Sequence, residues 1–133
     1  MNLNVFTLAT TNRKLAIDNY HISGVEEVSA GTTRVVFNSY NESSECWCSH
    51  AKVVHGTFEQ ILSIVDRKHF QLFVDASTDK RKSLNLSFIY RLEQVSEQVT
   101  TVKWWSPEGE TKRWHSLNVV GSFDEVLKQL EKK

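Results

Sequence analysis

Apolar residues recur along this chain with two different periods. Residues 3–9, 32–37 and 100–105 alternate apolar or β-branched positions with polar ones, which predicts β-strands. In two other stretches, about residues 57–67 and 122–132, apolar residues recur every three or four positions, which predicts amphipathic helices. The pattern predicts a chain that is mostly strand, with one helix near its midpoint and one at its end.

Each predicted helix begins at a capping residue. Thr57 is followed three positions later by Gln60, and Ser122 is followed three positions later by Glu125. This is the spacing of a capping box, in which side chains bind the free backbone N–H groups of the first turn. Both helices therefore have a defined start.

The whole pattern repeats after 67 positions. Between residues 6 and 49, an ungapped shift of 67 gives 12 identities in 44 positions, and two single-residue deletions extend the match to the second helix. A fixed internal period indicates a repeated structural unit. The aligned pairs include Ile22 with Ile89, Val35 with Val102, Trp47 with Trp114, Ser49 with Ser116, Val54 with Val120 and Phe58 with Phe123.

The repeat predicts an α+β protein of two units, residues 1–67 and 68–133. Each unit should contain four or five mainly antiparallel strands followed by one helix, at about 57–67 and about 122–132. A unit of about 65 residues buries too little surface to be stable alone. We therefore expect the two units to pack together as a pseudo-twofold internal dimer.

A hairpin in the second unit brings aromatic residues and lysines together. The turn residues lie between Pro107 and Glu110, and a tip at residues 108–109 would place Trp105 opposite Lys112. The opposite face would point to the core, because Val35 and Phe37 occupy it in the first unit. The outer face then carries Lys103, Trp105, Lys112 and Trp114.

These residues, together with Trp47 of the first unit, are the candidate binding residues. Exposed tryptophans are typical anchors of protein interfaces. Aromatic rings beside lysines also stack bases and hold phosphates. A third interpretation is that the tryptophans cover the core between the two units.

The nearest approach to a metal site is Cys46, Cys48 and His50, which would share one face of a strand. Thiolates and imidazole suit zinc, but this spacing is not usual for a structural zinc site. We expect no metal and no cofactor. We also expect no catalysis, because the chain has no nucleophile elbow and no glycine-rich phosphate loop.

Charge and composition narrow the range of partners. The chain has 16 basic and 16 acidic residues, with a balance of −2 in residues 1–67 and +2 in residues 68–133. This is too little positive charge to predict non-specific binding of nucleic acid. The sequence has no membrane-spanning stretch, no secretory signal and only two cysteines, so we expect a cytoplasmic protein without a membrane partner.

A short motif of core positions and a helix cap recurs in both units. In the second unit it consists of Ile89, Leu92, Glu93, Val95, Val102, Val120, Ser122, Phe123, Val126 and Leu127. This motif resembles small flagellar regulatory proteins of the FlbD type and, more loosely, the β-rich DNA-binding module of LytTR response regulators. The first resemblance implies a regulatory role, and the second implies DNA binding.

From the sequence we expect a small non-catalytic binding or regulatory protein that acts through protein contacts. Its size fits the modules of phages, mobile elements and immunity systems. The alternative is a LytTR-like protein that binds nucleic acid through the basic, tryptophan-rich face of the second unit. A third alternative is an enzyme or ligand-capture protein with a site where the two units meet.

Overall fold

The computed structural model describes residues 2–65 and 67–131. We call residues 2–65 the first half and residues 67–131 the second half. The first half contains β1 (Leu3–Thr7), β2 (Lys14–Asp18), β3 (Ile22–Glu27), β4 (Thr32–Asn41), β5 (Cys46–His55) and α1 (Phe58–Ile64). The second half contains β6 (Phe70–Val74), β7 (Arg81–Asn85), β8 (Ile89–Gln94), β9 (Val99–Glu108), β10 (Thr111–Val120) and α2 (Phe123–Glu131).

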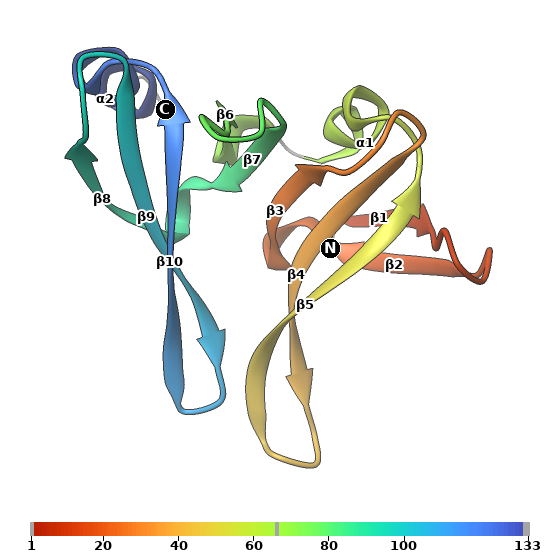
Figure 1. Cartoon of the computed structure of the whole chain (residues 1–133). Helices are drawn as coiled ribbons and strands as arrows, with labels where there is room; N and C mark the ends of the chain where they lie inside the picture. Colours follow the sequence, from red (N-terminus) through yellow and green to blue (C-terminus); the bar gives the residue numbers. More distant parts are fainter. Residues whose placement is uncertain (1, 66, 132–133) are drawn as a thin grey trace.

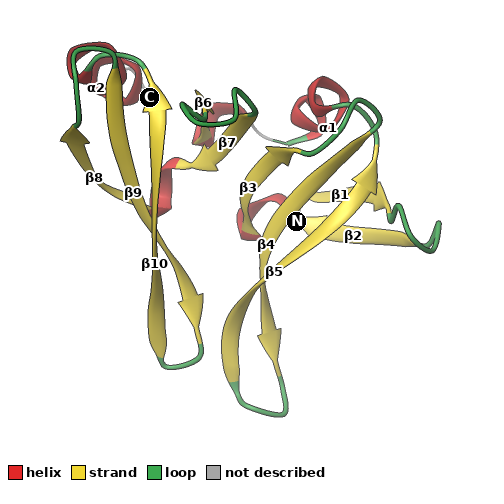
Figure 2. Cartoon of the chain, in the orientation of Figure 1, coloured by secondary structure: helices red, strands yellow, loops and turns green. Residues whose placement is uncertain are grey.

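The protein is α+β, as expected, and its strand ladders are antiparallel. The strands of the larger sheet follow the order β10-β9-β5-β4-β3-β7-β6, and β8 pairs with β9 outside this path; β1 and β2 form a separate two-stranded sheet. The long hairpins β4–β5 and β9–β10 point the same way (Figure 1). Both helices lie at the opposite end of the molecule from the hairpin tips (Figure 2).

The order of elements in the first half recurs in the second. Strands β1 to β4 and β6 to β9 begin 67 positions apart, whereas β5 and β10 begin 65 apart. The two missing residues belong to the hairpin turn, which spans residues 42–45 in the first half and 109–110 in the second. The two deletions expected further along the chain are therefore misplaced.

This shift changes which residues correspond. Trp47 lies opposite Tyr40, whereas Trp114 lies opposite Trp105, so the alignment of the two tryptophans is wrong by two positions. Val54 bridges to Leu8 in the first half and Val119 bridges to Asp75 in the second, so Val54 corresponds to Val119. A hydrogen-bonded turn accommodates insertions more easily than a ladder, because residues within it need not match a partner strand.

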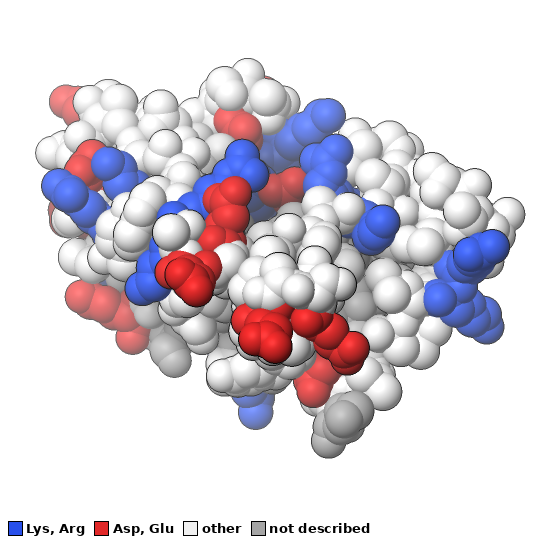
Figure 3. Space-filling view, turned by 90° about the horizontal axis from the view of Figure 1, so that it is seen from below, with Lys and Arg blue, Asp and Glu red and all other residues white. Residues whose placement is uncertain are grey.

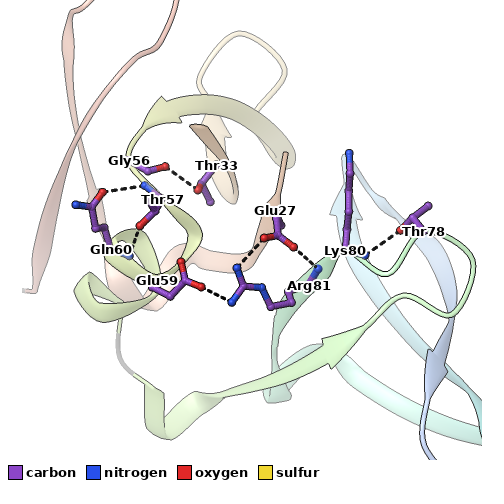
Figure 4. Close-up of polar contacts among 9 residues, drawn as sticks. All are labelled: Glu27, Thr33, Gly56, Thr57, Glu59, Gln60, Thr78, Lys80 and Arg81. Atoms are coloured by element: carbon purple, nitrogen blue, oxygen red, sulfur yellow. Dashed lines mark hydrogen bonds and ion pairs between the residues drawn. The ribbon is translucent and has the colours of Figure 1, made fainter. Parts of the chain in front are cut away.

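The helices begin where the capping residues predict. Thr57 and Gln60 form both bonds of a capping box, at 3.1 and 2.8 Å (Figure 4). Ser122 accepts a bond from the Glu125 backbone at 3.2 Å. Helix α1 ends earlier than expected because Val65 is extended and buries its side chain in the core. Asp66 and Lys132, within the expected helix ranges, lie outside the described residues.

Each half has its own hydrophobic cluster. The first gathers eleven buried side chains around Ile22, Val25 and Val35, and the second gathers five around Val102 and Val119. Val35, Phe37 and Val102 are at most 8 % exposed, which confirms the core face predicted for the hairpins. Phe70 of the second half packs into the first cluster, so the two cores are joined at this residue.

The halves are joined mainly by one strand pair, β3 with β7. Gly24, Val25 and Glu26 lie opposite Leu84, Ser83 and Lys82. Asn85 strengthens the end of this ladder, because its Nδ2 donates to the Ile22 carbonyl oxygen at 3.0 Å while its Oδ1 accepts from the Ser87 backbone. A buried amide with both ends bonded fixes the register of the two strands.

Arg81 adds an ionic contact to the same seam. Its guanidinium binds Glu27 at 2.7 Å and also binds Glu59 on α1, and its backbone N–H donates to Glu27 at 3.0 Å (Figure 4). The bonds from Arg81 lower the pKa of Glu27 below its ordinary value of 4.5. Next to this group, Lys82 pairs with Glu26 at 2.9 Å.

The reciprocal pairing, β2 with β8, is not among the ladders of the described residues. The side chains at the corresponding positions explain why. Asp18 stands where Asn85 stands and has no N–H group to donate, and Lys14 stands where Arg81 stands and has no planar fork. On β8, the strand that corresponds to β3, Arg91 and Gln94 stand where β3 has Gly24 and Glu27.

Exchange of the amide for a carboxylate tests the seam. Asn85→Asp removes the donor to Ile22 and sets a charge against a buried carbonyl, so we expect the free energy of unfolding to fall by about 1–3 kcal/mol. Asp18→Asn is the matched control, because either side chain accepts the bond from Tyr20. Urea unfolding measures both, and equal losses in the two variants would contradict this role of Asn85.

The ion pairs of Arg81 make stability depend on pH. Because the folded-state pKa of Glu27 is depressed, the contribution is fully present above the unfolded pKa near 4.5 and is lost as the pH falls through the folded pKa. Glu27→Gln should cost about 1 kcal/mol at pH 7, and less below about pH 4. Urea unfolding at pH 7 and pH 3.5 measures this, with Glu42→Gln in the first hairpin turn as control.

Candidate functional site

The register of the β9–β10 hairpin differs from the expected one by two residues. Its tip is Gly109–Glu110, so Trp105 lies opposite Trp114 and Lys112 opposite Pro107. Gly109 has a φ of 62°, in the left-handed region that a two-residue turn needs. A shift of two keeps every side chain on the same face, so Lys103, Trp105, Lys112 and Trp114 share one face of the hairpin although the expected cross-strand pairs are wrong.

Aromatic rings and one lysine are in contact on this outer face. The Lys112 ammonium lies 4.4 Å from the centre of the Trp105 ring and 5.9 Å from that of Trp114. Tyr90 meets Trp114 edge to face, with ring centres 5.2 Å apart. Trp114 is 60 % exposed and Tyr90 is 49 % exposed. We call Tyr90, Lys103, Trp105, Lys112 and Trp114 the aromatic–lysine face.

Tyr90 is the member of this face that the sequence does not predict. Strict alternation along β8 does not place it beside Trp114, but the ladder with β9 is shifted between Ile89 and Arg91. Such a bulge redirects the side chain next to it. The first half has the same irregularity between Ile22 and Gly24, where Ser23 occupies the corresponding position.

The two lysines of the face are in different electrostatic surroundings. Lys103 lies 3.5 Å from the carboxylate of Glu93, which also binds Arg91 at 2.8 Å. Within the described residues Lys112 is in no ion pair. Lys112 therefore contributes a cation without a carboxylate partner, held over the aromatic rings.

Trp47 does not belong to the aromatic–lysine face. Its ring stacks on His21, with centres 4.8 Å apart and planes at 26°, and contacts Tyr40. It lines a cleft between the two halves, and Trp105 lines the same cleft from the other half. The structure therefore brings Trp47 and Trp105 to a common space and leaves Trp114 on the outer surface.

This seam cleft has a volume of about 810 Å³. Aromatic side chains from both halves line it, among them His21 and Trp47 from the first and Phe88 and Trp105 from the second. Phe88 meets Trp105 edge to face at 4.9 Å. The polar lining includes Asn38, which is 8 % exposed and whose Oδ1 is buried without a hydrogen-bond partner.

The structure does not group Cys46, Cys48 and His50 as ligands of one ion would be grouped. The two Sγ atoms are 3.8 Å apart, and the Cys46 sulfur lies 2.9 Å from the Ser44 hydroxyl. His50 packs against the Phe37 ring instead. In residues 2–65 and 67–131, no three His, Cys, Asp or Glu side chains are grouped as ligands of one ion would be.

A serine and a histidine do meet in the second half. The hydroxyl of Ser106 lies 2.8 Å from Nε2 of His115, whose ring stacks on Trp104. Burial is the main cause that lowers the pKa of His115. Ser106 is only 3 % exposed, so it is not positioned to attack a substrate. The pair satisfies two polar groups inside the sheet rather than forming a nucleophile and base.

No family model matches this chain, and neither the curated proteins nor the solved structures include a match. The resemblance to FlbD-type and LytTR proteins therefore stays a prediction. The described helices are all too short, or too polar, to cross a lipid bilayer.

The different exposure of neighbouring tryptophans predicts different effects on stability. Trp104 packs on the second core, so Trp104→Ala should lower the free energy of unfolding by about 3 kcal/mol. Trp114→Ala removes a mostly exposed ring and one aromatic pair, so the loss should be about 1 kcal/mol or less. Urea unfolding compares them, and a loss at Trp114 as large as that at Trp104 would show that this ring is structural.

Proposed function

We propose that this chain is a non-catalytic binding protein that acts through protein contacts on its aromatic–lysine face. The observation that carries the proposal is the exposure of Trp114, which two neighbours orient and which no part of the described chain covers. An oriented ring loses little further conformational freedom when a partner covers it. Rings of this kind are typical anchors of protein interfaces.

The charges around the face indicate the chemistry of the partner. An apolar or aromatic side chain would cover Trp114 and Tyr90, and an adjacent carboxylate would bind Lys112. Lys103 contributes less, because Glu93 already lies beside it. The partner surface is therefore an apolar group flanked by an acidic residue.

Nucleic acid is the alternative occupant of the same face. It fits less well because sustained binding needs several cations that neutralise phosphates, and here one of two lysines is paired with a glutamate. Lys, Arg, Asp and Glu side chains are interspersed on the face of the molecule seen from below (Figure 3). That distribution supports a protein partner rather than a polyanion.

The same proposal includes the architecture and the location of the chain. We infer that residues 1–67 and 68–133 are two tandem repeats packed as a pseudo-twofold internal dimer. The matching order of elements supports this. The β3–β7 ladder and the β5–β9 bridge, neither of which has a reciprocal pairing among the described residues, are where the pair departs from twofold symmetry. The chain has only two cysteines, two positions apart, which make no disulfide framework; this composition supports a cytoplasmic location.

Affinity capture from host lysate with matched variants tests the proposal. The wild-type chain should retain a partner protein. The control variant Tyr40→Ala, which changes a similarly exposed aromatic residue of the first half, should retain the same protein. Trp114→Ala should weaken binding of that protein about 30-fold or more, and Lys112→Ala about tenfold. Titration of the identified partner by calorimetry measures these losses.

Two results would overturn the proposal. Equal affinity of the wild-type chain and Trp114→Ala would exclude this face as the contact. Binding of single-stranded or duplex oligonucleotides that weakens steeply with salt, with a slope flattened by the double variant Lys103→Ala and Lys112→Ala, would establish the nucleic-acid alternative.

A further inference from the structure

We propose that the seam cleft is a small-molecule site for a flat, uncharged heteroaromatic ring with N–H donors, such as a nucleobase or a nucleoside without phosphate. This site is separate from the aromatic–lysine face in everything except Trp105. At about 810 Å³ the cleft is within the size range of ligand sites, which commonly lie where two units meet.

The aromatic lining favours a flat ring. Trp47 is held by its stack on His21, and Trp105 by its edge contact with Phe88, so both indoles are oriented before a ligand arrives. The four side chains come from both halves, which places aromatic surface on two sides of the same space. Stacking on indole is available to any base, because every base has a π-face.

Asn38 supplies the polar requirement. Its Oδ1 is the one buried side-chain N or O atom without a hydrogen-bond partner in the described part of the chain. Less than 1 Å² of this oxygen is exposed, so a ligand donor reaches it when the Asn38 amide turns toward the cleft that the residue lines. The bond then removes the cost of an unpaired buried acceptor. Trp105 occupies the corresponding position of the second half, 67 residues later, so the repeat places an acceptor and a stacking ring at matched positions of one cleft.

The remaining polar groups argue against an oligosaccharide. Asn85 uses both ends of its amide within the protein, on the Ile22 carbonyl and the Ser87 backbone, and Asp18 already accepts a bond from Tyr20. An oligosaccharide would bury many hydroxyl groups and these two side chains are already engaged, whereas a nucleoside can leave its ribose in solvent and bury only the base. A heteroaromatic amine needs only a few acceptors.

The charge of the lining argues against a phosphate. The described residues around the cleft include no lysine or arginine, and they include the carboxyl group of Asp18. Anion sites normally present guanidinium, ammonium or backbone N–H groups. The ligand is therefore a donor-bearing ring without a phosphate group.

Calorimetric titration of the full chain tests this site. Adenosine, cytidine, guanosine and uridine serve as probes, with adenosine 5′-monophosphate and maltose as comparison ligands. At least one nucleoside should bind with a Kd of about 1 mM or tighter. The NMR indole signals of Trp47 and Trp105 should shift, while that of Trp104 stays in place. The monophosphate should bind more weakly, and maltose should give no heat.

Two variants distinguish a ligand group from a structural one. Asn38→Leu should weaken nucleoside binding at least tenfold without lowering the midpoint of urea unfolding, because it removes an acceptor that nothing in the protein uses. Trp47→Ala should also weaken binding about tenfold or more. Trp114→Ala should leave it unchanged, which separates this test from that of the protein-binding face.

Other outcomes reject the inference. Tighter binding of the monophosphate would make the cleft an anion site, and binding of maltose alone would make it a sugar site. No heat from any nucleoside at about 10 mM would show that the cleft holds only solvent. A clear loss of stability in Asn38→Leu, with nucleoside affinity unchanged, would assign Asn38 to the fold.

Discussion

The pairing of β3 with β7 is the contact on which the rest of this structure depends. It is a short ladder, from Gly24 to Glu26, but the bonds of Asn85 and Arg81 fix its register. Once it forms, Phe70 enters the core of the first half and the two long hairpins are brought together near Cys48 and Glu108. The seam cleft exists only because these contacts hold the halves at this spacing.

The repeat shares its scaffold and differs on its surfaces. The positions common to both halves are core residues, capping residues and the bonds from Thr33 to Gly56 and from Thr100 to Gly121. Residues at matched positions that differ create the candidate sites. A side chain that folding does not require can differ between the two halves, so halves with the same order of elements present different surfaces.

Local features were predictable from the sequence, and pairings between distant segments were not. Thr57 and Ser122 mark helix starts because a cap depends on residues three positions away. The predicted register of the β9–β10 hairpin was wrong by two residues, because both tips keep the tryptophans on one face and the sequence pattern does not distinguish them. The β3–β7 ladder joins strands about 60 residues apart, and no periodicity within either strand indicates its partner.

Some residues of the candidate site were likewise predictable from the sequence, and others were not. Trp105, Trp114 and Lys112 were predictable as one surface because alternation along two strands places them there. Tyr90 was not, since a bulge redirects it. The unpaired oxygen of Asn38 has no sequence signal at all, because satisfaction of a polar atom is decided by the whole fold.

The two halves are joined by β3 and β7 without a reciprocal ladder among the described residues, so the seam can form only after β7 has been synthesised. A ribosome completes α1 and then needs 21 more residues to reach Asn85, about 1–4 s at usual elongation rates. Until β7 is made, β3 has no partner on that side, and an unpaired strand edge is a template for pairing with another chain. The second half is tethered to this edge at high local concentration, so β3 meets β7 of its own chain before it meets a neighbouring molecule.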